Sequence, residues 1–167
     1  QGRQTDRKVE FIAPDFTTKL TDENVSNRPM NQYKTIENFW YLELGGNRDT
    51  IGDTEELRDE LVPLALGAWD YIKNSGKCDA ENWELEFLGQ IPAKRESRRM
   101  LGEHKVTERD VADNVHFEDT VAYGGWPIDD HYPAGYYHVG TPNTDIQTPS
   151  PYCLPYRALY SKNVDNL

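Results

Sequence analysis

The sequence is poor in cysteine and in basic residues, and it has no long apolar run. Cys78 and Cys153 are the only cysteines in 167 residues, which excludes a disulfide-rich scaffold. Two distant cysteines most often stay free thiols in a reducing compartment, although a single disulfide is an alternative. No segment approaches the ~20 apolar residues of a membrane helix. The net charge of −11, from 18 basic and 29 acidic residues, argues against a nucleic-acid partner.

Two sequence motifs, one for nucleotide binding and one for catalysis, are also missing. There is no Gly-x-Gly-x-x-Gly after a predicted strand, so nothing indicates a dinucleotide phosphate loop. There is no Gly-x-Ser-x-Gly, so a serine hydrolase with a nucleophile elbow is poorly supported. These absences leave binding modules and enzymes of other classes open.

One long helix is the clearest structural feature. The length predicts one domain over residues 1–167, with residues 1–8 frayed. Asp53, followed by Glu56, predicts a capping box at the start of a helix that ends near Asn74. Pro63 lies inside this helix and should kink it. Its apolar stripe, at a spacing of 3.6 residues, consists of Leu57, Leu61, Leu64, Ala65, Ala68 and Ile72.

Short aromatic or alternating runs predict strands. They lie at Val9–Ile12, Phe39–Leu44, Trp83–Phe87, 96–106 with Gly102 as a bulge, and Thr120–Tyr123, with a helical turn from Thr107 to Ala112. After Trp126, closely spaced prolines and tyrosines exclude long helices. The predicted fold class is α+β: a mixed or antiparallel sheet covered by one long helix, with a Pro/Tyr-rich irregular C-terminal third.

A local cluster of positive charge suggests an anion site. Lys94, Arg95, Arg98 and Arg99 lie within six positions of an acidic chain. Guanidinium groups bind carboxylates and phosphates through paired hydrogen bonds. The alternative is that these side chains form ion pairs with Asp and Glu on a solvated face.

Three separated segments resemble a large bacterial family of FAD-dependent oxidoreductases. They are Ile91-Pro-Ala-Lys-Arg-Glu-Ser-Arg-Arg99, Tyr123-Gly-Gly-Trp-Pro-Ile-Asp-Asp-His131 and the run from Pro155 to Leu167. Ala93 stands where the family pattern has Gly. The resemblance implies that the chain is an internal, substrate-side cap of a longer flavoprotein that transfers hydride from a small polar substrate to FAD. It also implies that FAD is bound mainly by parts absent from this chain, in an FAD-binding domain of the same polypeptide.

The resemblance also suggests roles for particular residues. Arg95, Ser97 and Arg98 would contact substrate or flavin, together with Trp126, and Tyr156 and Arg157 would face the cofactor. An interdomain ion pair is the alternative for Arg157.

A second group of polar residues follows Trp126. Asp129, His131 and His138 are candidate acid–base residues, because an Asp–His pair can remove a substrate proton. The alternative is that both histidines fix loop turns by hydrogen bonds. Their spacing matches no zinc pattern, so no metal site is predicted.

A carbohydrate-binding module is the rival function. Exposed aromatic rings stack on sugars, and Trp40, Trp126 and Tyr137 would form the platform. A binder of neutral sugars does not need the basic cluster, which therefore favours the oxidoreductase.

Overall fold

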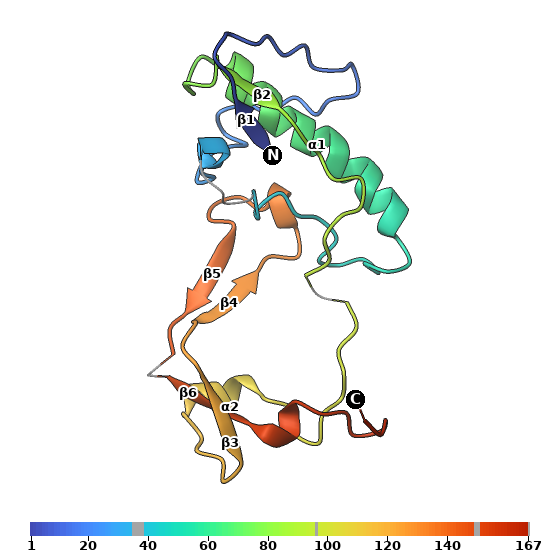
Figure 1. Cartoon of the computed structure of the whole chain (residues 1–167), viewed down its shortest axis with the longest axis vertical. Coiled ribbons are helices and arrows are strands. Elements are labelled where there is room, and N and C mark those ends of the chain that lie inside the picture. The colour runs from blue at the N-terminus through green and yellow to red at the C-terminus, as the bar shows by residue number, and fades with distance from the viewer. Residues whose placement is uncertain (35–38, 96, 149–150, 167) are drawn as a thin grey trace. The chain divides into compact units, whose positions relative to one another are not determined.

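The computed structural model describes residues 1–34, 39–95, 97–148 and 151–166 (Figure 1). The chain forms two compact units. Unit 1 comprises Gln1–Glu96 and His131–Pro142, and unit 2 comprises Ser97–Asp130 and Asn143–Leu167. Each unit is therefore assembled from two separate stretches of sequence.

The first residues of unit 1 include a strand, within the stretch 1–8 that the sequence predicted to fray. β1 (Gly2–Gln4) pairs antiparallel with β2 (Trp83–Leu85), and this register places Gly2 opposite Leu85. Polar residues are ordered here because their backbone groups find partners far along the chain. β2 is shorter than predicted, and Phe87 beyond it is 63% exposed.

The predicted helix is present as α1 (Figure 1), which spans Thr54–Asn74. Pro63 lies within it. Asp53 occupies the N-cap, but its side chain makes no capping hydrogen bond, so the predicted capping box does not form. The Asp53 carboxylate instead lies 3.5 Å from Nε of Arg48. Arg48 also forms ion pairs with two glutamates of the first turns, Glu56 and Glu60. The acidic start of α1 is therefore held by a cation from the preceding loop.

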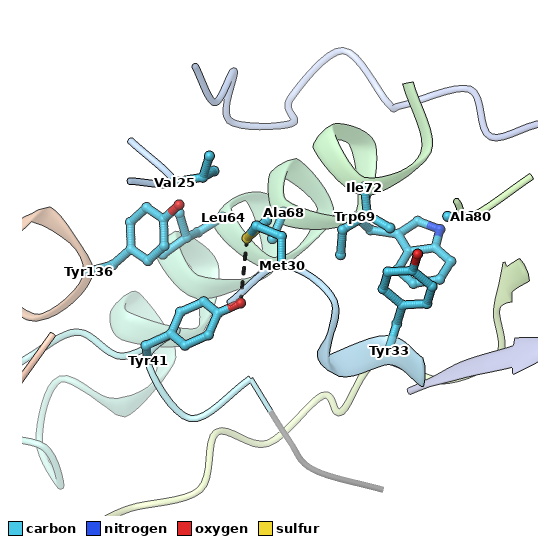
Figure 2. Close-up of a cluster of buried hydrophobic side chains, with 10 residues drawn as sticks. All are labelled: Val25, Met30, Tyr33, Tyr41, Leu64, Ala68, Trp69, Ile72, Ala80 and Tyr136. Atoms are coloured by element: carbon cyan, nitrogen blue, oxygen red, sulfur yellow. Dashed lines mark hydrogen bonds between the residues drawn. The ribbon is translucent and has the colours of Figure 1, made fainter. Parts of the chain in front are cut away.

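The core of unit 1 gathers along α1 (Figure 2). Leu64 and Ile72, both in the predicted stripe, are 0% and 1% exposed. Tyr33 packs edge-on against Trp69, with ring centroids 6.1 Å apart. The buried side chains shown in Figure 2 are Val25, Met30, Tyr33, Tyr41, Leu64, Ala68, Trp69, Ile72, Ala80 and Tyr136. Aromatic rings therefore fill much of the core of unit 1, alongside the aliphatic side chains.

A buried arginine joins the two stretches of unit 1. Arg28 is 7% exposed, and its Nη2 donates to the carbonyls of Tyr136 and His138 at 2.7 and 2.9 Å. The Tyr136 ring, in η2 (Gly135–Tyr137), lies 4.7 Å from the guanidinium carbon. Burial raises the pKa of Tyr136 to about 12, so its phenol stays neutral beside this cation.

Two predicted strands of unit 1 are absent. Residues 9–12 form a loop, and residues 39–44 contain a turn in which the Leu42 amide donates to the carbonyl of Phe39 at 2.9 Å. Tyr41 nevertheless points into the core and is 1% exposed. The aromatic character of this run therefore reflects packing against α1 rather than strand pairing.

The structure is α+β in the broad sense predicted, but the described residues form no continuous sheet. Their strands form three separate two-stranded sheets: β1 with β2, β3 (Thr120–Gly124) with β6 (Tyr152–Pro155), and β4 (Ile128–His131) with β5 (Asn143–Ile146). α1 packs against the first of them, where a Cβ built on Gly2 would lie 3.0 Å from the Trp69 ring. The single helix-covered sheet that the sequence predicted is thus replaced by small ladders.

The short helix that the sequence predicted in unit 2 is present, and its N-cap forms as expected. α2 (Glu108–Ala112) begins after Thr107, whose hydroxyl accepts from the Asp110 amide while the Asp110 carboxylate accepts from the Thr107 amide. Both halves of the capping box are therefore formed. The C-terminal third is less irregular than expected, because it also carries β4, β5, β6 and η3 (Tyr156–Ala158).

Other predictions for unit 2 were partly wrong. Among the described residues 97–106 there is no strand, and Gly102 forms only an isolated bridge with Ser161; Glu96 lies outside the described residues. β3 is where a strand was expected, and its residues Val121 and Tyr123 are 55% and 71% exposed.

Candidate functional site

Unit 1 contains a cavity of about 420 Å³ on the α1 side of the run at residues 39–44. Most of its walls are apolar, and three charged side chains reach it, namely those of Glu43, Arg58 and Arg95. The remaining lining residues are Phe39, Trp40, Leu42, Leu44, Leu61, Val62, Ala65, Leu88, Gly89, Ile91, Pro92 and Ala93. A mainly apolar cavity with a few polar groups is the usual form of a small-molecule site.

Three segments build the cavity, and the local sequence explains each. On α1, Arg58, Leu61 and Ala65 follow one another at helical spacing, so they line one side of the helix, next to the fully buried Leu64. The turn at residues 39–44 sends Tyr41 to the core and leaves its neighbours for the cavity. The third wall is the segment 88–95, which Gly89 and Pro92 keep out of regular structure.

Glu43 links the two candidate side chains of this site. Its Oε1 is 2.5 Å from Nδ1 of His131, and its Oε2 is 3.7 Å from Nη1 of Arg95. The side chains of Glu43 and His131 are only 18% and 17% exposed, whereas that of Arg95 is 50% exposed. Trp40, in the cavity wall, contacts the His131 ring edge-on at a centroid distance of 5.6 Å. A carboxylate thus joins an imidazole on one side and a guanidinium on the other.

This arrangement can hold an anion and move a proton. Glu43 accepts a hydrogen bond from Nδ1–H of His131, which fixes the ring and, when the imidazole is neutral, leaves its basic lone pair on Nε2. A carboxylate at one ring nitrogen also stabilises the imidazolium that forms when the other nitrogen takes up a proton. The Arg95 guanidinium supplies the positive charge that an anionic ligand requires.

The structure thus brings Arg95 and His131 together around Glu43, and the contacts of the other two predicted acid–base residues are with other partners. Nδ2 of Asn143 donates to Oδ1 of Asp129 in unit 2 at 2.8 Å. His138 lies in unit 1, where its ring stacks on Tyr132 with a centroid distance of 3.5 Å.

The remaining predicted site residues belong to unit 2. Ser97 and Arg98 are exposed, and Trp126 is 73% exposed. Tyr156 is 57% exposed and packs against another tyrosine, Tyr160. Arg157 forms an ion pair of 2.9 Å with Asp119, which belongs to the same unit, so this pair is not the interdomain one considered from the sequence.

The other two basic residues of the cluster have separate environments. Nζ of Lys94 donates to the carbonyl of Thr50 and the hydroxyl of Thr54, at 2.6 and 2.5 Å, and so ties the third cavity wall to the start of α1. Arg99 lies in unit 2 and is exposed.

The sequence analysis did not identify Glu43 or Arg58 as site residues, and it considered Trp40 only for the rival carbohydrate platform. Glu43 carried a usable signal, since it is the one charged residue in the apolar run from Phe39 to Leu44. A charge kept within such a run needs a partner when it is buried, and His131 is that partner. Arg58 gave no comparable signal, because charged residues are ordinary on a helix.

The described residues offer neither a metal centre nor a membrane-spanning helix. No group of three or more His, Cys, Asp or Glu side chains there is placed to hold a metal ion. Within the same residues, no helix has both the length and the apolarity to cross a membrane. Cys78 and Cys153 are free thiols.

Comparison with known proteins identifies the family of the chain. No curated protein and no solved structure matches it. A protein-family model described as FAD dependent oxidoreductase matches residues 3–167, which is nearly the whole chain. The resemblance carried by the segments around Arg95, Trp126 and Arg157 is confirmed by that match. The chain belongs to the FAD dependent oxidoreductase family.

Proposed function

We propose that this chain is the substrate-binding cap portion of an FAD dependent oxidoreductase. The observation that carries the proposal is the unit 1 cavity, in which an apolar chamber is joined by Glu43 to a histidine and an arginine. In this proposal the full protein removes hydride from a bound substrate, and FAD accepts the two electrons. Apolar walls such as Trp40 and Leu61 would exclude water from that step.

The described residues do not fit the pyrophosphate of FAD. A dinucleotide site needs glycines that let phosphate approach the N-terminus of a helix. The glycines before α1 are occupied otherwise, since a Cβ on Gly45 would meet Leu57 at 2.8 Å and one on Gly46 would meet Pro133 at 2.5 Å. The first turn of α1 carries acidic residues, Glu55 and Glu56, that repel phosphate. We therefore propose that an FAD-binding domain of the same polypeptide, outside this chain, holds most of the cofactor.

The residues of this chain would act on the substrate. Arg95 would bind its anionic group, and the Glu43–His131 pair would accept the proton released when a hydroxyl or amine is oxidised. Asp129 and His138 stay predicted acid–base residues. Ser97, Arg98, Trp126, Tyr156 and Arg157 stay predicted contacts of substrate or cofactor.

The test is flavin reduction by the full-length protein. With FAD bound, a panel of small hydroxy and amino acids is mixed anaerobically, and bleaching of the flavin band identifies a substrate. His131→Asn and Glu43→Gln should slow that reduction by about 10²–10⁴-fold and 10-fold or more, respectively, and should flatten its pH profile. His116→Asn is the control, because His116 lies in unit 2 beside Cys153. Equal rates for wild type and His131→Asn would contradict the acid–base role.

A second test uses the 167-residue chain alone. It should purify colourless and bind FAD weakly, because no phosphate cradle exists among its described residues. A yellow preparation with one flavin per chain would overturn the cap assignment.

The rival carbohydrate module gains no specific support. Of its three platform residues, Trp40 contacts Tyr41 and His131 edge-on, in unit 1, whereas Trp126 belongs to unit 2. The family match instead favours redox chemistry.

A further inference from the structure

We infer that the unit 1 cavity binds an organic acid with an apolar body, an inference that rests on the proposed function and narrows its substrate class. The family resemblance implied a small polar substrate. The cavity walls instead favour a ligand whose carboxylate meets Arg95 and whose hydrocarbon part lies against the aromatic and aliphatic side chains.

The size and chemistry of the walls argue for the apolar body. A chamber of about 420 Å³ exceeds the needs of a two- or three-carbon acid and falls within the usual range for organic ligands. Phe39 and Trp40 offer aromatic contact, and Leu61 and Ile91 offer aliphatic contact. Ile91 is 84% exposed, so a bound hydrocarbon group would remove it from water, which a small polar acid would not.

The charges argue for the acid. The charged lining residues are Glu43, Arg58 and Arg95, which together give +1, in a chain whose net charge is −11. Arg58 is held on its own helix by Asp59, its neighbour, at 2.8 Å. The Arg95 side chain is half exposed and lines the cavity, so a ligand carboxylate can reach its guanidinium beside Glu43.

Glu43 contributes to the same selectivity. One oxygen of its carboxylate is 2.5 Å from Nδ1 of His131, and the other oxygen faces Nη1 of Arg95 at 3.7 Å. It therefore orients the guanidinium and keeps the negative charge of an incoming acid on the Arg95 side of the chamber. In the full enzyme, this orientation would also set the carbon beside the acid group near the His131 pair.

Isothermal titration of the 167-residue chain tests the inference with three probes. Phenylacetate has the acid and the ring, phenylacetamide has the ring without the charge, and glycolate has the acid without the ring. Phenylacetate should bind at least about tenfold more tightly than either of the others, because each lacks one of the two interactions. Circular dichroism confirms that every variant tested is folded.

Arg95→Met is the decisive variant. It should weaken the binding of phenylacetate by about tenfold or more and leave the affinity for phenylacetamide unchanged. Arg109→Met is the matched control, since Arg109 is 89% exposed in unit 2 and its loss changes the net charge equally. It should leave all three affinities unchanged.

Three results would overturn the inference: no phenylacetate binding, equal affinities for phenylacetate and phenylacetamide, or equal losses in Arg95→Met and Arg109→Met. Binding of riboflavin in place of phenylacetate would also overturn it, because the chamber would then accept the flavin ring. The proposed function fails separately, if the full-length protein with FAD shows no substrate-dependent bleaching.

Discussion

Replacing Leu64 and Leu61 by alanine, one at a time, tests whether α1 faces two different environments. Leu64 is 0% exposed in the unit 1 core, while Leu61 is partly buried and lines the cavity. Leu64→Ala removes fully packed carbons, so we expect a loss of about 3–5 kcal/mol in the free energy of unfolding. Leu61→Ala widens a space that already exists, so we expect about 1–2 kcal/mol from the lost burial alone.

The assay is guanidinium unfolding followed by tryptophan fluorescence. A Trp126→Phe background confines the signal to unit 1, because Trp126 belongs to unit 2 and the other tryptophans, Trp40, Trp69 and Trp83, belong to unit 1. The slope of free energy against denaturant should stay constant across the variants. A Leu61→Ala loss as large as that of Leu64→Ala would refute the division of α1 into a core side and a cavity side.

Two further predictions concern close packing and pH. Gly67→Ala should lower the free energy of unfolding by about 1–3 kcal/mol, because the new Cβ would lie 2.2 Å from the Thr18 carbonyl oxygen. This clash should outweigh the higher helix propensity of alanine. A thermal melt with an unchanged or higher midpoint would contradict the prediction. The hydrogen bond from the Thr107 amide lowers the pKa of Asp110, so its stabilising effect is present above the unfolded pKa and is lost as pH falls through the folded pKa. Asp110→Asn should therefore lower the free energy of unfolding at pH 7 and make its fall below pH ~4 less steep. Asp113→Asn, at an exposed carboxylate, should cause neither effect. Parallel curves of stability against pH for wild type and Asp110→Asn would rule out the capping role.

The parts of the fold that were predictable depend on neighbours in sequence. The α1 stripe repeats every three or four residues, and the Thr107 cap is completed three residues later, so both could be inferred from a short window. The run Phe39–Leu44 has strand-like composition, but whether it pairs depends on a partner that local sequence does not reveal. The Asp53 box failed because Arg48 draws its carboxylate away from the helix N–H groups.

The same reasoning explains the site. Arg95 was identifiable because positive charge is locally unusual in this acidic chain. The partner of His131 was not identifiable, since Glu43 lies 88 residues away and reaches it only after the chain returns to unit 1. Asp129 was the nearer carboxylate in sequence, yet proximity in sequence does not determine which groups meet in a fold.

The interleaving of the two units has a consequence for the order of folding. Residues 1–96, 97–130, 131–142 and 143–167 alternate between the units, so the chain passes from one to the other three times. On the ribosome, Arg28 emerges 108 residues before Tyr136, whose carbonyl it must reach. Until then the Arg28 guanidinium lacks two of its carbonyl acceptors, and the core lacks the Tyr136 ring. Such long-range closure slows folding, and a truncation after residue 96 would produce a protein that cannot complete either unit.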